Sequence, residues 1–292
     1  MWSVRSYFGI FFFSFFFSVL FCVGCCLVDS LLGFWVFLEL CGLSLIPSFF
    51  FNSKVGVHGF YGCLLNYVIM SGLSSVLMVC GLLFGGLYYF LFIGFIVKFG
   101  LFPFSLWVYR VFSDSGWMFI FFLSVILKFP VLFFCFLFQI NVLSLVYVDC
   151  FLTIMVCGLL FWFFSPSWEY VWCHISLSSV STLVVSCFCS EVWVCLFIYF
   201  YYFIWASFCI IYFCLVGSYW SFNGRFWWYC FLLLVTPVSF PLFYKLGVCF
   251  AIFYSSFYVL FGWCIYSFSE QFFLFKLGGD YFYSEIYNNW SG

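Results

Sequence analysis

Hydrophobic residues run along this chain in long stretches that are interrupted by charges, prolines and small polar clusters. A stretch of about 20 apolar residues is long enough for an α-helix to cross a bilayer, and the stretches predict about ten such helices. The expected helices cover residues 7–28, 31–51, 58–84, 86–107, 117–138, 143–164, 170–189, 192–216, 226–246 and 248–268. The predicted fold class is therefore all-α, a polytopic membrane helix bundle.

Nothing in the pattern indicates a second domain. We expect one transmembrane domain over residues 1–268 and a polar C-terminal tail over residues 269–292, in which Glu270 and the residues after it lie at the surface. The first stretch, Tyr7–Cys26, is long for the hydrophobic region of a signal peptide and has no A-x-A site after it, so we expect it to remain as a helix.

Composition supports the membrane assignment. Of the 292 residues, 68% are hydrophobic and 6% are charged, whereas a soluble domain has about 45–50% apolar and about 25% charged residues. The net charge of −1 gives no reason to expect a nucleic-acid partner. The 54 Phe, 18 Cys, 14 Trp and 21 Tyr favour a genome rich in T and G, and a mitochondrial gene is the natural source.

The cysteines do not form a recognisable metal motif. Cys22, Cys25 and Cys26 come closest, but they lie inside an apolar run with no histidine or carboxylate near enough to complete a ligand set. In lipid, cysteine behaves as a small hydrophobic residue. Since His58 and His174 are the only histidines, haem or copper ligation is not expected either. We expect no metal and no cofactor in this chain.

The distribution of charge predicts the topology. If each stretch crosses once, Arg5, Lys54, Arg110, Arg225 and Lys276 all fall on the side of the N-terminus. The opposite side holds acidic residues only, namely Asp29, Asp149 and Glu191. The positive-inside rule then places the N-terminus on the cytoplasmic side, or on the matrix side of a mitochondrion.

Some charges fall inside the apolar stretches rather than in loops, namely Glu39, Lys98, Lys128 and Lys245. An ionised side chain at the bilayer centre costs about 2.5–3.5 kcal/mol on insertion scales, so such residues usually serve a function. A lysine near a helix end can instead reach the headgroups, and Glu39 with Lys98 can be a purely structural pair. The candidate function of these side chains is proton transfer.

Prolines accompany the lysines. Pro103, Pro130, Pro237 and Pro241 each lie within eight residues of one of them. Proline removes a backbone donor and frees a carbonyl in the preceding turn, and in a membrane such breaks persist only beside protein or internal water. We expect two broken helices, at Lys128–Pro130 and at Pro237–Lys245. The alternative is a simple kink, since proline is common in membrane helices.

Four segments carry a resemblance to a known family. Phe34–Leu40 with Leu45–Pro47 is similar to its Trp-x-x-Leu-Glu…Ile-Pro segment, and Lys98–Trp107 is similar to its Lys-x-Gly-x-x-Pro-Phe-His-x-Trp motif. Leu127–Pro130 and Pro237–Lys245 are similar to its two later proline segments. These segments resemble subunit 2 of mitochondrial NADH dehydrogenase (ubiquinone), an antiporter-like membrane-arm subunit of respiratory complex I.

The resemblance implies a role for each buried charge. Glu39 and Lys98 would form the coupling ion pair, Lys128 would be the central relay lysine, and Lys245 would exchange protons with the far side. Ser105 stands where the family has a histidine. His174 is displaced within its helix, so either serines such as Ser179 and water bridge the lysines or His174 acts from another turn. The family's last helix is also expected to be missing after residue 268.

The resemblance further implies partners and a location. Other membrane-arm subunits and the lipid bilayer would surround the chain in the mitochondrial inner membrane, with the N-terminus in the matrix. FMN, iron–sulfur clusters and ubiquinone would be bound by partner subunits, so that NADH oxidation belongs to the assembly. A stand-alone secondary cation or proton transporter and a structural membrane anchor are the alternatives. Co-purification with flavin- and iron–sulfur-containing partners distinguishes the subunit from the transporter.

Overall fold

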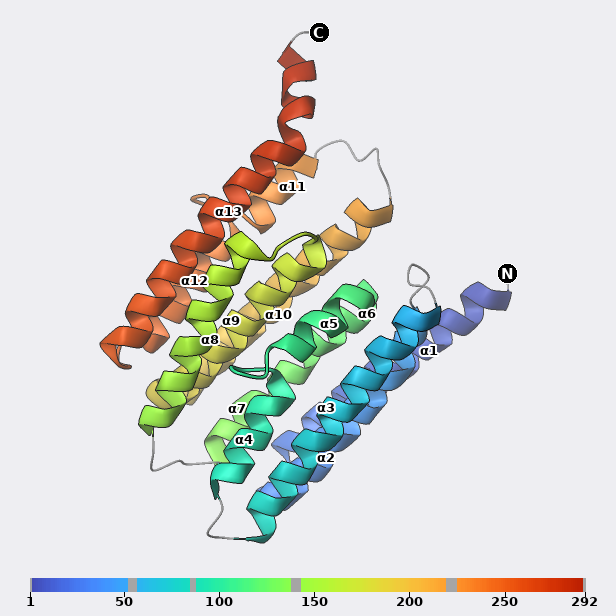
Figure 1. Ribbon diagram of the computed structural model, residues 1–292, viewed down its shortest axis with the longest axis vertical. Coiled ribbons are helices and arrows are strands. Elements are labelled where there is room, and N and C mark those ends of the chain that lie inside the picture. The colour runs from blue at the N-terminus through green and yellow to red at the C-terminus, as the bar shows by residue number, and fades with distance from the viewer. Residues whose placement is uncertain (1, 52–56, 85–87, 138–142, 219–224, 291–292) are drawn as a thin grey trace.

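The computed structural model is a bundle of helices (Figure 1), and it describes residues 2–51, 57–84, 88–137, 143–218 and 225–290. Every element in these ranges is a helix, which confirms the predicted all-α class. The α-helices are α1 (Trp2–Cys26), α2 (Leu31–Leu45), α3 (Val57–Leu83), α4 (Tyr88–Phe99), α5 (Leu106–Asp114), α6 (Trp117–Ser124), α7 (Phe129–Leu137), α8 (Leu143–Phe163), α9 (Trp168–Cys189), α10 (Val192–Ser218), α11 (Arg225–Leu232), α12 (Phe240–Ile252) and α13 (Phe257–Trp290). Two 3₁₀ segments, η1 (Ile46–Phe51) and η2 (Ile126–Lys128), join them.

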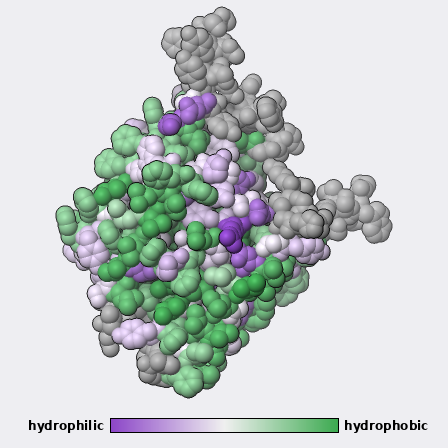
Figure 2. Space-filling view, viewed as in Figure 1, coloured by the Kyte–Doolittle hydropathy of each residue, from purple (hydrophilic) through white to green (hydrophobic). Residues whose placement is uncertain are grey.

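The fold is that of a polytopic membrane protein. Within the described residues, 7 helical segments are long and apolar enough to cross a membrane, and two shorter apolar helices accompany them. Large hydrophobic side chains such as Phe16, Trp193 and Phe257 are exposed, and hydrophobic residues cover most of the face shown in Figure 2. An exposed apolar surface of this extent is suited to lipid.

Helix α9 lies at the centre of the polar interior. Its residues from Val171 to Cys187 are all buried. Serines and threonines of this helix face its neighbours instead of water, and they include Ser176, Ser178, Ser179, Ser181, Thr182 and Ser186. Most of these hydroxyls donate to a carbonyl one turn earlier in the same helix. A membrane helix can therefore carry them without unsatisfied donors while their oxygens remain available as acceptors.

Several helix ends that are close to basic residues gather at one end of the bundle. Helices α1 and α11 begin, and α5 and α13 end, at the same end of the bundle, opposite the turns that join α1 to α2 and α9 to α10 (Figure 1). Lys54 lies outside the described residues. Asp149 lies inside α8, within the helix predicted over 143–164 and near its first turns.

Where the sequence predicts a helix over 86–107, the chain forms α4 and α5 with an irregular stretch between them. Gly100 ends α4 with φ +67°, while Leu101 N–H donates to Ile96 O at 3.0 Å and Gly100 N–H donates to Val97 O at 3.3 Å. This is the Schellman pattern that glycine favours. Pro103 lies in the turn that follows. The indole of Trp107 donates to the Val97 carbonyl at 3.0 Å and so satisfies one of the released acceptors.

The break predicted around Pro237 is confirmed, since α11 ends at Leu232 and α12 begins at Phe240 with Pro241 in its first turn. Side chains of other helices satisfy the open backbone. Trp205 donates to Leu232 O at 2.8 Å, and Gln271 Oε1 accepts from Val235 N–H at 2.8 Å. A helix interrupted at membrane depth requires such partners.

The break predicted at Lys128–Pro130 is also present, but it lies just before the proline. Helix α6 ends at Ser124 and α7 begins at Phe129, with Val125 and η2 between them and Pro130 as the second residue of α7. Proline fits the first turn of a helix, because the N–H that it lacks has no intrahelical partner there. The result is a 3₁₀ kink, and the hydroxyl of Tyr199 donates to Val125 O at 3.2 Å beside it.

The C-terminal segment also differs from the prediction. The helix expected over 248–268 is replaced by the end of α12 and by α13, which continues to Trp290 through the residues assigned to a polar tail. Glu270 is not at the surface, because only 3% of it is exposed. A carboxylate can be buried when a cation faces it, and Lys245 does so from α12.

Candidate functional site

The charges predicted inside the apolar stretches lie in the interior of the bundle, where they are buried or partly buried. On the α2 side, Lys98 Nζ lies 2.6 Å from Glu39 Oε1 and forms a salt bridge. Lys98 lies in the last turn of α4, where the helix dipole favours a cation. It also donates to Ser71 Oγ of α3 at 3.4 Å. The pairing that the resemblance implied is present, and Lys98 is buried while Glu39 is partly exposed.

Lys128 is held differently. Its Nζ donates to Ser179 Oγ at 2.5 Å, to the Tyr202 hydroxyl at 2.7 Å and to Ser176 O at 2.9 Å. The amine also lies 4.1 Å from the centroid of the Tyr202 ring, a distance at which a cation is attracted to the ring face. Only 2% of the residue is exposed. Among the described residues no carboxylate forms a salt bridge with Lys128, so neutral oxygens alone hold this amine.

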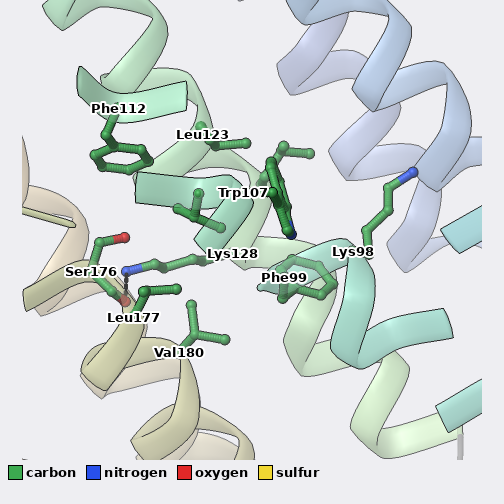
Figure 3. A pocket seen from close by; sticks show the side chains of 11 residues that line it. Lys98, Phe99, Trp107, Phe112, Leu123, Lys128, Ser176, Leu177 and Val180 are labelled. Atoms are coloured by element: carbon green, nitrogen blue, oxygen red, sulfur yellow. Dashed lines mark hydrogen bonds between the residues drawn. The ribbon is translucent and has the colours of Figure 1, made fainter. Parts of the chain in front are cut away.

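A cavity separates Lys98 from Lys128 (Figure 3). It has a volume of about 30 Å³, which is room for about two water molecules. The amines of the two lysines point away from each other, while Trp107 and Phe99 lie between them. The lining is mainly apolar, with Leu123 and Val180 on other sides. The space between the two amines is therefore large enough for water but offers it few hydrogen-bond partners.

Lys245 has an acidic partner that the sequence analysis missed. Its Nζ lies 3.2 Å from Glu270 Oε1 and 3.4 Å from Ser267 O. The polar residues after position 268 led to the assignment of Glu270 to a tail. The usable signal is the apolar run Phe272–Phe275 on its far side, which shows that Glu270 interrupts a hydrophobic stretch and does not end it.

His174 lies apart from the lysine amines. Its Nδ1 is 2.7 Å from the hydroxyl of Tyr109, and its Nε2 is 3.1 Å from Ser165 Oγ and 3.3 Å from Phe164 O. His174 is fully buried. Of the two candidate relay residues on α9, the structure therefore brings Ser179 to Lys128 and directs His174 toward the turn that precedes α9. Tyr202, which completes the contacts of Lys128, was not predicted.

Tyrosine residues lie between Lys128 and Lys245. The hydroxyl of Tyr202 accepts from Lys128, and the rings of Tyr202 and Tyr244 have centroids 5.7 Å apart. Tyr244 directly precedes Lys245 in α12. Two tyrosine side chains therefore link the surroundings of the central lysine to those of the Lys245–Glu270 pair, in contrast to the apolar lining on the Lys98 side.

The fold and the site define a polytopic helical membrane protein with ionisable side chains in its interior. In comparisons with known proteins, no family model and no curated protein matches the chain. A chain of the solved structure "Respiratory complex I from Thermus thermophilus with bound Aureothin" has the same fold, with a TM-score of 0.74. The match covers 92% of this chain and 70% of that chain at 13% sequence identity, so it establishes a shared fold.

Proposed function

We propose that this chain is a proton-translocating membrane-arm subunit of respiratory complex I, of the subunit 2 type, in the mitochondrial inner membrane. The fold shared with a chain of a bacterial complex I supports the assembly. The buried Lys128, held only by neutral oxygens between two lysine–carboxylate pairs, supports the chemistry. This lysine carries the proposal, because an ionisable side chain in the interior of a membrane protein costs folding free energy and usually serves a function.

The proposed relay uses each buried charge in turn. A proton that arrives at Lys128 adds a positive charge, which weakens the attraction between Glu39 and Lys98. Charges interact over long distances where the effective dielectric constant is low. A proton can then leave Lys98, while Lys245, which receives protons from the side of Lys128 and Tyr244, exchanges protons with the far side. Ser179, and His174 toward the N-terminal side, are the neutral groups that complete the path.

The subunit would hold no redox centre of its own. FMN, iron–sulfur clusters and ubiquinone would belong to partner subunits, and the electron transfer there would drive the relay. A stand-alone transporter would move protons or cations when purified alone. The proposed subunit is expected to be inactive alone and to co-purify with flavin- and iron–sulfur-containing proteins, and solubilisation in mild detergent followed by cofactor spectroscopy decides between the two.

Lys128→Met tests the chemistry. Loss of a general acid–base group slows proton transfer by about 100-fold or more, so we expect the share of proton pumping that belongs to this chain to vanish. The measurement is protons translocated per NADH oxidised by the assembled complex in sealed vesicles. Lys276→Met, at an exposed position of α13, is the control and should pump normally. An unchanged ratio in an assembled Lys128→Met complex contradicts the relay.

A further inference from the structure

We propose that Glu270 is the proton-accepting partner of Lys245 and that Gln271 positions its carboxylate against the break between α11 and α12. The inference rests on the proposed function and adds a second acid to the relay. It starts from the salt bridge of 3.2 Å between Lys245 Nζ and Glu270 Oε1.

The burial of Glu270 suits a relay. It lies about 20 Å along the axis of α13 from Phe257, and only 3% of it is exposed. Tyr229 of α11 and Leu274 of α13, which are in contact where these two helices pack together, are buried as well. Removing a carboxylate from water costs several kcal/mol, which a single ion pair does not always repay. A purely structural role would be filled as well by a pair of apolar side chains.

Gln271 connects the carboxylate to the broken helix. Its Nε2 donates to Glu270 Oε1 at 3.2 Å and approaches Leu233 O at 3.4 Å, while its Oε1 accepts from Val235 N–H at 2.8 Å. One amide therefore links α13 to two backbone groups that the end of α11 leaves open. Because the same Oε1 contacts both Gln271 and Lys245, the geometry of the break sets the position of the carboxylate.

Two tyrosines give the pair a route to the centre of the protein. Tyr244 directly precedes Lys245, its ring centroid lies 5.7 Å from that of Tyr202, and the Tyr202 hydroxyl accepts from Lys128. Tyr266 lies one turn before Glu270 in α13. The buried hydroxyl of Tyr266 has no hydrogen-bond partner within the described part of the chain. It is therefore available to a water molecule or to a protonated Glu270.

The proposed step is a proton transfer within the pair. An N–H bond of the Lys245 ammonium breaks and an O–H bond forms on the Glu270 carboxylate, which leaves a neutral amine and a neutral carboxylic acid. No other reactant is needed. The neutral amine can then accept a proton from the hydroxyl chain on the Lys128 side, and the acid can release its proton toward the far side.

The principal test removes both charges together. In the complex with Lys245→Met and Glu270→Met, no buried charge is left without its partner, so folding and assembly should be retained. We expect the pumping share of this chain to disappear, with proton transfer slowed by about 100-fold or more, while NADH oxidation with an artificial electron acceptor stays normal. Normal pumping in this double variant overturns the proposal. Glu191→Gln, at an exposed acid before α10, is the control.

Infrared difference spectroscopy of the assembled complex during turnover supplies an independent readout. A carboxylic acid band is expected that is lost in Glu270→Gln and shifted in Gln271→Leu, whereas Glu270→Asp should restore pumping in part. A band unaffected by Glu270→Gln overturns the assignment. Lys128→Met separates the two hypotheses. If it abolishes pumping and the double Met variant does not, the roles of Lys245 and Glu270 are wrong while that of Lys128 stands, and if neither affects pumping, the proposed function itself is wrong.

Discussion

At the scale of single residues, the three lysines in the interior fall into two kinds. Lys98 and Lys245 each face a carboxylate, whereas Lys128 is held by two hydroxyls and a carbonyl. A neutral shell stabilises an ammonium less than a carboxylate does, and it also tolerates the neutral amine. Lys128 is therefore the site at which a change of charge costs least, and its hydroxyl partners should control that change.

Tyr202→Phe tests this control. The substitution removes an oxygen that accepts from Lys128 at 2.7 Å, and loss of one hydrogen bond to a buried charge costs about 1.5–3 kcal/mol. We expect proton pumping per NADH to fall while the assembled complex still forms. Tyr199→Phe is the matched control, because its hydroxyl bonds the same kinked segment at Val125 O without reaching the lysine. Equal pumping in the two variants would count against a role for Tyr202.

The sequence was sufficient to find the buried charges but not all of their partners. Glu39, Lys98, Lys128 and Lys245 stand out because an ionised residue in an apolar stretch is rare. The partners of Lys128 come from α9 and α10, far along the chain, and are ordinary serine and tyrosine residues. No local pattern marks them. Their role follows from the packing of three helices, which the sequence alone does not specify.

At the scale of helices, the break between α4 and α5 and the break between α11 and α12 have different causes. Gly100 produces the first through a left-handed backbone conformation, and a Cβ at this position would lie 2.2 Å from Val108 Cγ2. The second contains Pro237 and depends on Trp205 and Gln271 for its hydrogen bonds. Both breaks lie close to a lysine, at Lys98 and Lys245. The irregular backbone therefore belongs to the geometry of the site.

Gly100→Ala is expected to damage the first break. A non-glycine residue in the left-handed region costs about 1–2 kcal/mol, and the contact with Val108 adds to this. The apparent melting temperature of the solubilised complex should fall, together with pumping. Gly72→Ala in α3 provides the comparison, since nothing lies within 4 Å of a Cβ there, and it should leave both unchanged. Identical melting of the two variants would show that the turn does not depend on glycine.

Proline alone was an incomplete guide to the breaks. Its presence correctly predicted the interruptions at Pro237 and near Pro130, but at Pro130 the irregular stretch precedes the proline, which lies in the first turn of α7. The interruption near Pro103 depends on Gly100, whose effect a composition-based division into apolar stretches overlooks. A helix boundary is decided by which side chains can satisfy the open backbone groups. Those side chains, such as Trp107 and Trp205, become identifiable only in the folded bundle.

At the scale of the whole molecule, hydropathy predicted the architecture well because the bilayer imposes it. Backbone groups in lipid must be satisfied within each segment, so long apolar stretches become helices. The C-terminal end escaped this logic, because polar residues such as Glu270 lower the hydropathy of α13 although they face the interior. A buried ion pair between α12 and α13 removes the cost that a hydropathy profile assigns to each charge separately.

The arrangement of the bundle predicts that both ends of the chain lie on one side of the membrane. Helix α1 begins and helix α13 ends at the same end of the bundle (Figure 1), and under the proposed function the positive-inside rule would assign that side to the matrix. Protease-cleavable epitope tags at the N-terminus and the C-terminus should both be protected in intact mitoplasts and be cut in inverted membranes. A tag placed between Ser190 and Glu191, in the turn between α9 and α10, should show the reverse. An odd number of crossings would place the two terminal tags on opposite sides of the membrane. Cleavage of the two tags from opposite sides would therefore contradict this topology, on which the direction of the proposed relay depends.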